Sequence, residues 1–167
     1  MKVRSRRASR NRKSRVPLSS LRTSEAVRTI VNHPRRLDEL VSMIEDSDRR
    51  VRDRAAATLA RLAESHPGRL LRVLDRLAEN LSDDSACVRW NLAFAFGAVG
   101  TQFPRRLPDF LPKLADRLDD ENRVVRVIAC RSLMRVAAHH PKPVFEHFET
   151  SKRQVPQPLQ RLLRARR

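Results

Sequence analysis

The sequence predicts an all-α protein in which about three similar helical hairpins stack into a right-handed solenoid, with partial helices capping the two ends. Three observations carry this prediction: residues repeat with a period of 37, each repeat holds two amphipathic helical stretches, and the composition disfavours β-sheet. The 167 residues include only 3 Gly, no Tyr and 4% aromatic side chains, whereas sandwiches and barrels need many tight turns. Hydrophobic residues make up 40% of the chain, which is enough to bury a core.

The 37-residue period is visible as columns of residues with matching chemistry. Val51, Val88 and Val125 align, and an arginine follows each of them. The other columns hold aspartate, arginine, proline or large apolar residues, and they are Asp46/Asp83/Asp120, Arg52/Arg89/Arg126, Pro67/Pro104/Pro141, Leu40/Leu77/Leu114 and Leu59/Phe96/Leu133. Self-similarity at a fixed period is typical of repeat proteins. We therefore expect repeats at about residues 35–66, 67–103 and 104–140.

Each repeat is expected to contain two helices joined by an acidic turn. The first helix has apolar residues at i, i+3, i+4 and i+7, as over residues 37–44. The turn, at residues 46–48 in the first repeat, supplies Asp and Ser to cap the next helix and complement its dipole. The second helix ends before the proline column, because proline has no N–H to continue the helix. We also expect a partial unit at residues 23–34 and a closing helix at residues 143–149.

An aspartate in the turn, followed six residues later by an arginine that Val precedes, resembles the HEAT repeat over about residues 35–140. In HEAT repeats this aspartate and arginine commonly form a ladder between neighbouring repeats. The resemblance therefore implies a structural ladder made of Asp46, Arg52, Asp83, Arg89, Asp120 and Arg126. HEAT-like solenoids serve as scaffolds, as transport receptors and, rarely, as enzymes, so the resemblance is informative about the fold and weak about the function.

Positive charge is concentrated at the two ends of the chain. The protein has 36 basic and 19 acidic residues, a formal net charge of +17. Residues 1–22 and 151–167 hold fifteen of the basic residues and no acid, so residues 23–150 carry only +2. We expect residues 1–22 to be a disordered Arg-rich tail, residues 23–150 to be the repeat domain, and residues 151–167 to be a basic tail or helix.

We call the two basic ends, residues 1–22 and 151–167, the arms. They favour binding to nucleic-acid phosphates or to another polyanion, because the arginine guanidinium can donate two hydrogen bonds to one phosphate. The residues expected to bind a polyanion are Arg4, Arg6, Arg7, Arg10, Arg12, Lys13, Arg15, Arg161, Arg164, Arg166 and Arg167. The alternative interpretation of these arms is a solubilising tail with no specific partner.

The second helices of stacked repeats are expected to line the concave surface, which is the usual binding side of such arrays. At about 100° per residue, Trp90 and Phe94 lie opposite the buried side of their helix, and Gly97 and Ala98 leave space beside them. The expected concave-face binding residues are Trp90, Asn91, Phe94, Arg54, Arg61, Arg131 and Arg135. An aromatic pair within an arginine rim is typical of an interaction hot spot and could equally stack a base.

Two alternatives remain open for this aromatic pair. The C-terminal segment, with Leu159, Leu162 and Leu163, can fold back and cover it, or the surface can bind an external partner. A few HEAT-like proteins, the alkylpurine DNA glycosylases, use a concave aromatic cradle with a catalytic carboxylate. Here no carboxylate lies beside Trp90, and Asp53, one repeat away, is the only acid expected on this face.

We expect no catalytic residue, no cofactor and no metal site. Three glycines cannot build a phosphate-binding loop or a nucleophile elbow. His139, His140 and His147 lack the i, i+4 spacing that places two ligands on one helical face. Two cysteines fit a reducing compartment, and no apolar run approaches the roughly 18 residues of a membrane span, so we expect a cytoplasmic protein.

The leading hypothesis is a non-catalytic HEAT-repeat module that associates with nucleic acid or a nucleoprotein complex through its Arg-rich termini. The alternative is a protein–protein scaffold that binds a peptide or helix in the concave groove. A protein related to the alkylpurine DNA glycosylases is a third and less favoured hypothesis. The sequence leaves the oligomeric state open.

Overall fold

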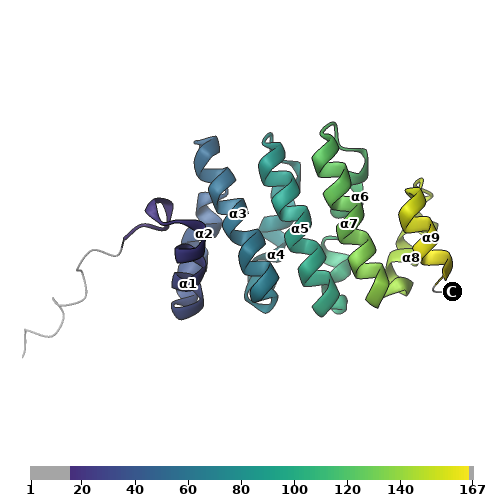
Figure 1. Ribbon diagram of the computed structural model, residues 1–167, viewed down its shortest axis with the longest axis horizontal. Coiled ribbons are helices and arrows are strands. Elements are labelled where there is room, and N and C mark those ends of the chain that lie inside the picture. Colours follow the sequence, from purple (N-terminus) through teal and green to yellow (C-terminus); the bar gives the residue numbers. More distant parts are fainter. Residues whose placement is uncertain (1–15, 166–167) are drawn as a thin grey trace, which may run out of the picture.

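A computed structural model of the protein describes residues 16–165, which contain helices and turns and no strand (Figure 1). The α-helices are α1 (Thr23–Asn32), α2 (Leu37–Met43), α3 (Arg49–Ser65), α4 (Leu74–Glu79), α5 (Ala86–Gln102), α6 (Leu111–Asp116), α7 (Arg123–His139), α8 (Pro141–Ser151) and α9 (Gln157–Ala165). Short 3₁₀-helices separate them: η1 (Leu18–Ser20), η2 (Pro34–Arg36), η3 (Pro67–Val73), η4 (Asn80–Ser82), η5 (Pro104–Asp109) and η6 (Arg117–Asp119).

The helices form two layers. The helices α1, α3, α5, α7 and α9 follow one another side by side along the array, and the shorter helices α2, α4 and α6 lie behind them (Figure 1). The helices α3, α5 and α7 each have 17 residues and begin 37 residues apart, so the sequence period is also the period of the stack. The prediction of an all-α solenoid is confirmed.

Local sequence signals set where the long helices begin and end. The Asp48 carboxylate accepts a hydrogen bond from the Arg50 N–H at the start of α3, and the Asn122 side chain accepts from the Val124 N–H at the start of α7. The three long helices end two residues before the proline column, which holds Pro67, Pro104 and Pro141. Proline then begins the next helical segment, where its missing N–H costs nothing.

The apolar columns of the repeat meet in one core between the layers. Leu59, Phe96 and Leu133 occupy equivalent positions on α3, α5 and α7, and none is more than 1% exposed. The ring of Phe96 packs on Phe110 from the neighbouring layer, with ring centroids 4.6 Å apart. This packing ties the orientation of each long helix to the second layer.

At Gly97 the helix α5 lies close against α7. A Cβ atom at this position would lie 2.6 Å from the Cβ of Ser132 and 2.9 Å from its Cα. Gly97 and Ala98 are both buried, so the expectation that they leave space on the binding face is wrong. The helix α7 fills that space.

We expect Gly97→Ala to destabilise the protein, although the same change in an exposed helix interior stabilises by about 1 kcal/mol. The new methyl group meets the backbone of α7 as well as a side chain, so the two helices must move apart at a cost of about 1–3 kcal/mol. Urea unfolding followed by circular dichroism measures the change. A gain in stability would contradict the close approach.

The predicted boundary at residue 22 is displaced in the structure, because part of the expected tail packs on the repeats. Leu18 is 1% exposed, and its N–H donates to a Glu39 carboxylate oxygen at 2.9 Å. The Val16 carbonyl accepts from the Arg36 guanidinium at 2.8 Å. A few scattered apolar residues in an arginine-rich stretch are a weak sequence signal, and Leu18 is buried only because the repeats pack against it. Residues 1–15 lie outside the described part of the chain.

The C-terminal segment forms a helix that ends the array. Leu159 and Leu163 of α9 are buried, and α9 packs on α7 at the far end of the stack from α1 (Figure 1). Arg153, in the connection before α9, pairs with Asp116 at 2.7 Å and with Asp119 at 3.0 Å. The segment therefore closes the core instead of folding back over Trp90 and Phe94.

Candidate functional site

Arginines at the start of the long helices link each repeat to the next. Arg52 donates from Nε to Asp83 Oδ2 at 3.0 Å, and Arg89 donates from Nε and Nη2 to both carboxylate oxygens of Asp120 at 2.8 Å. Each of these arginines also donates to backbone carbonyls of its own turn; Arg89, for example, donates to the Asp83 carbonyl at 2.8 Å. The guanidinium thereby joins two turns at once.

The two ends of this series differ from its middle. Arg126 donates to the Asp120 carbonyl at 2.7 Å, and among residues 16–165 it makes no ion pair. The Asp46 carboxylate accepts from the Asp48 N–H at 2.8 Å, and within the same residues no arginine pairs with it. Within residues 16–165, the ion pairs of this arginine–aspartate ladder therefore lie at the two central junctions, where α3 meets α5 and α5 meets α7.

The pair of Arg89 and Asp120 is the most buried of these ion pairs, with side chains only 6% and 2% exposed. Burial alone would raise the pKa of the Asp120 carboxyl, but hydrogen bonds from Arg89 and from the Asn122 N–H outweigh it and hold that pKa below its ordinary value. The hydrogen bond with Asp120 raises the pKa of the Arg89 guanidinium. Both groups are therefore charged near neutral pH.

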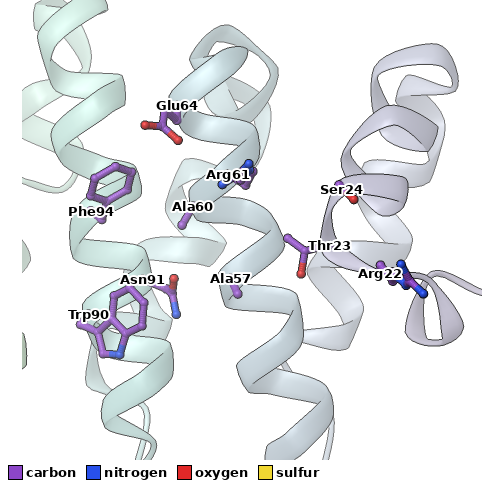
Figure 2. A pocket seen from close by; sticks show the side chains of 10 residues that line it. All are labelled: Arg22, Thr23, Ser24, Ala57, Ala60, Arg61, Glu64, Trp90, Asn91 and Phe94. Atoms are coloured by element: carbon purple, nitrogen blue, oxygen red, sulfur yellow. The ribbon is translucent and has the colours of Figure 1, made fainter.

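A hollow of about 570 Å³ opens on the exposed face of the long-helix layer, between α1, α3 and α5 (Figure 2). We call it the groove. Its volume lies within the usual range of ligand pockets, about 300–1,000 Å³. The residues that line it are Arg22, Thr23, Ser24, Ala57, Ala60, Arg61, Glu64, Trp90, Asn91 and Phe94.

The groove has an aromatic wall, a narrow alanine floor and a charged rim. Trp90 and Phe94 lie one turn apart on α5 and are partly exposed (Figure 2). Ala57 and Ala60 of α3 face them, and their small side chains leave the hollow open. Apolar walls with a few polar groups at the edge are typical of sites that bind ligands.

The structure brings together Trp90, Phe94 and Arg61 from the predicted concave-face set. Asn91 also lines the groove, but it is only 3% exposed and its amide donates to the Cys87 carbonyl at 2.9 Å. Asn91 therefore serves mainly to hold the start of α5.

The other predicted concave-face residues lie outside the hollow. Arg54 donates to the Ser19 carbonyl and so holds the N-terminal segment. Arg131 and Arg135 are exposed on α7, beyond the aromatic wall. Arg131 occupies the α7 position that is equivalent to Phe94 on α5, one 37-residue repeat further along.

Sequence reasoning missed Glu64 and the residues at the start of α1. Glu64 lies one turn after Arg61 on α3, so helical spacing could have identified it. No sequence pattern identifies Arg22 as a groove residue, because it falls within the predicted tail. It lines the groove only because α1 packs beside α3. Asp53, which was expected to be the only acid of this face, instead accepts a hydrogen bond from the Ser85 hydroxyl at the start of α5. Glu64 is the acid that lines the groove.

The predicted polyanion-binding residues lie mostly outside the described chain. Arg161 and Arg164 are exposed on α9. The remaining members are Arg4, Arg6, Arg7, Arg10, Arg12, Lys13, Arg15, Arg166 and Arg167, all of which fall in residues 1–15 or 166–167. Among residues 16–165 no three His, Cys, Asp or Glu side chains gather as a metal site requires, and no helix there is long and apolar enough to cross a membrane.

Trp90 is the single tryptophan of the chain, so its fluorescence reports directly on the groove. We expect a red-shifted emission that acrylamide quenches readily, because the indole is partly exposed. Trp90→Ala is expected to change the unfolding free energy by less than about 1 kcal/mol, as for a residue outside the core. A blue-shifted, protected emission or unfolding of the variant would place Trp90 in the core instead.

The ladder and the two layers of stacked helices define the class of protein as an α-solenoid repeat protein with a groove on its long-helix face. Solved structures of helical repeat proteins are similar to this fold. A designed armadillo repeat protein in complex with the peptide (KR)4 has a TM-score of 0.62 and 18% identity, with 89% of this chain and 69% of that chain covered. A computationally designed armadillo repeat protein for modular peptide recognition has a TM-score of 0.65 and 18% identity, covering 87% and 69%.

These likenesses show the fold alone and do not single out the HEAT type of repeat. No protein-family model and no curated protein matches the sequence. The function must therefore be argued from the groove itself.

Proposed function

We propose that this protein is a non-catalytic scaffold that binds a peptide segment of a partner protein in the groove. The observation that carries the proposal is the partly exposed pair Trp90 and Phe94 on the wall of a hollow in the long-helix layer. Aromatic side chains dominate binding hot spots because they bury a large area at a small entropic cost. The peptide complex of the similar designed armadillo repeat protein supports a peptide as the ligand.

The scaffold around the groove is suited to bind without rearranging. The aromatic wall lies on α5, which the ion pairs of Arg52 with Asp83 and of Arg89 with Asp120 connect to the repeats on both sides. The alanine floor lies on α3, whose inward side is held by Leu59 and Leu62 in the core. A groove that is already formed avoids an ordering cost on binding.

Selection from a random peptide display library on the full-length protein tests this proposal. Selected peptides should shift the fluorescence of Trp90, and Phe94→Ala should weaken them by about tenfold, or about 1.4 kcal/mol. Val124→Ala is the matched control, because Val124 is 53% exposed on α7 outside the groove. Failure to select any peptide, or binding that ignores both Trp90 and Phe94, would overturn the proposal.

Nucleic-acid association through the arginine-rich arms is a second candidate function, favoured by the eight basic and no acidic residues of positions 1–15. These basic side chains would contact phosphates with little sequence preference, so affinity should fall with salt by a log–log slope of about −0.9 per neutralised duplex phosphate. Filter binding to duplex DNA at several salt concentrations measures this slope.

The fragment that tests the arms must keep the residues of the arms that pack in the core. A fragment of residues 23–150 would remove Leu18, Leu159 and Leu163 from the core, and so confuse lost folding with lost binding. A fragment of residues 16–165 keeps these leucines and should lose most of the affinity for DNA. Equal binding by this fragment would move the nucleic-acid site onto the described body, and no binding by the full chain at low salt would exclude this candidate.

A further inference from the structure

The small net charge of residues 23–150 conceals a separation of charge between parts of the solenoid. The intra-repeat turns, at residues 44–48, 83–85 and 120–122, contain seven acidic residues and no basic one. The helices α1, α3, α5 and α7 contain three acidic residues, Glu25, Asp53 and Glu64, and eleven arginines. These arginines are Arg28, Arg49, Arg50, Arg52, Arg54, Arg61, Arg89, Arg123, Arg126, Arg131 and Arg135. The layer that carries the groove is therefore strongly basic.

The arginines around the aromatic wall are not used by the fold. Arg61, Arg131 and Arg135 are exposed, and none of them makes an ion pair within residues 16–165, unlike Arg52 and Arg89 of the ladder. Arg22 adds a further exposed guanidinium at the α1 edge of the groove. Exposed arginines beside exposed aromatic residues are the composition of a binding surface.

The order of these side chains along the array is arginine, aromatic, arginine. Arg61 lies on α3, Trp90 and Phe94 lie on α5, and Arg131 lies on α7. Packed helices are about 8–10 Å apart, so about 20 Å separates the two arginine positions. An extended peptide rises about 3.3 Å per residue, so about three residues span each step between helices.

We propose that the groove binds an extended acidic peptide in which one aromatic or large aliphatic residue has acidic residues two to three positions away on each side. This inference rests on the proposed function and names its ligand class. The central side chain packs on Trp90 and Phe94, and the flanking carboxylates pair with Arg61 on one side and Arg131 on the other. Arginine suits this role because its planar guanidinium binds a carboxylate with two hydrogen bonds.

The charges of the groove disfavour a basic peptide such as the (KR)4 bound by the similar designed protein. Arg22 and Arg61 outnumber Glu64 along the lining, and Arg131 and Arg135 extend the positive surface across α7. For the same reason the N-terminal residues 1–15, with eight basic residues, are not the occupant. Like charges placed together at an interface oppose binding.

The interruption of positive charge at α5 favours a peptide over a nucleic acid. A nucleic-acid strand carries a phosphate at every residue, so phosphates crossing α5 would pass over Trp90 and Phe94 with no cation to meet them. Arg89, the single arginine of α5, is buried in its pair with Asp120. A peptide can place an uncharged side chain at that point and its carboxylates on either side.

Three synthetic peptides test the inference: Glu-Glu-Ser-Phe-Ser-Glu-Glu, and the same sequence with every Glu replaced by Gln or by Lys. Titration of the full-length protein, followed by Trp90 fluorescence at low salt, gives each dissociation constant. We expect the Glu peptide to bind at least about tenfold more tightly than the Gln peptide, and the Lys peptide to bind least. Added salt should reduce the difference, since the Debye length is about 8 Å at 0.15 M.

Charge-reversal variants locate the carboxylates. Arg61→Glu and Arg131→Glu are each expected to weaken the Glu peptide by about tenfold and to strengthen the Lys peptide. Arg105→Glu is the matched control, because it makes the same charge change at an exposed residue of η5 in the other layer. This control should stay within about twofold of the natural protein, since a distant exposed charge is screened.

The outcomes separate this inference from the proposed function. If the Gln or Lys peptide binds as tightly as the Glu peptide, or if only unrelated library peptides bind, the acidic ligand is wrong and the peptide scaffold stands. If neither these peptides nor any selected one changes Trp90 fluorescence, both proposals fail. If a short oligothymidylate changes Trp90 fluorescence while the Glu peptide does not, the groove binds single-stranded nucleic acid and the inference is overturned.

Discussion

Phe96→Asp is expected to abolish the cooperatively folded state. Phe96 is 1% exposed and packs on Phe110 between the two layers of helices. Removing the ring costs about 3–5 kcal/mol, and the carboxylate adds the penalty of an unpaired charge in the core. Together these losses reach the whole stability of a typical domain, about 5–15 kcal/mol. Circular dichroism should show lost helicity and no cooperative thermal transition.

Phe94→Asp is the matched control for this prediction. Phe94 lies two residues earlier on the same helix, and its side chain is partly exposed in the groove. The variant is expected to keep its helical spectrum and a cooperative transition, while binding to groove ligands weakens. Unfolding of both variants to the same extent would contradict the assignment of the two faces of α5. Leu59→Asp and Leu133→Asp should behave like Phe96→Asp, because both residues are fully buried.

Asp120→Ala is expected to reduce the unfolding free energy by about 3–5 kcal/mol, as for the loss of one partner of a buried ion pair. Asp120 receives two hydrogen bonds from Arg89 and one from Arg117, which is also partly buried. Without the carboxylate, Arg89 remains buried at the junction between the second and third repeats, with the exposed Glu121 carboxylate as its remaining ionic partner. Urea unfolding at pH 7 measures the loss.

The neighbouring Glu121 provides a control that contacts the same arginine. The Glu121 carboxylate pairs with Arg89 at 3.1 Å, but its side chain is 85% exposed. Exposed pairs contribute about 0–1 kcal/mol, so Glu121→Ala should change stability little. If Glu121→Ala loses much stability and Asp120→Ala loses little, the exposed pair and not the buried one stabilises the junction.

The pH dependence of stability gives an independent measurement on Asp120. Because its pKa in the folded protein lies below the ordinary value of about 3.9, the folded state favours the ionised carboxylate. The resulting stabilisation is present above the unfolded pKa and is lost as the pH falls through the folded one. The stability of the natural protein and that of Asp120→Ala should therefore converge below about pH 4. A constant difference between them down to pH 2 would contradict this role.

Two sets of contacts hold the helices around the groove in place. The core column with Leu59, Phe96 and Leu133 fixes the long helices against the second layer, and the ion pairs at the turns fix the repeats to one another. Both sets of contacts lie away from Trp90 and Phe94. The groove can therefore vary in chemistry without loss of the fold, which is typical of repeat scaffolds.

Much of the fold could be predicted from the sequence because repetition makes local patterns redundant. One amphipathic stretch is weak evidence for a helix, but three stretches in a common register, each ended by proline, reinforce one another. The ladder residues were implied by the resemblance to the HEAT repeat, and the structure pairs Arg52 with Asp83 and Arg89 with Asp120, each across 31 residues. Helical spacing was also sufficient to place Trp90 and Phe94 on one face.

The lining of the groove could be predicted only in part, because it depends on which helices become neighbours. Arg22 lines the groove through the packing of α1 on α3, and no local pattern marks that contact. The burial of Gly97 could not be predicted for a related reason. The space beside a glycine on a helix is occupied by whichever element packs against it, and here Ser132 of α7 occupies that space. The ends of the array could not be predicted, because isolated apolar residues such as Leu18 become buried only through the repeat that they cover.

The sequence by itself determined the helical class and the 37-residue period, because both follow from local periodicity and from chemistry repeated at a constant spacing. Only the tertiary structure decided that the helices α1, α3, α5 and α7, which carry eleven arginines and three acidic residues, form one layer. It also decided that the aromatic pair borders a hollow shared by three helices. The physical reason is that the environment of a charge or an aromatic ring is made by side chains that are distant in sequence. Tertiary packing decides which of those side chains become its neighbours.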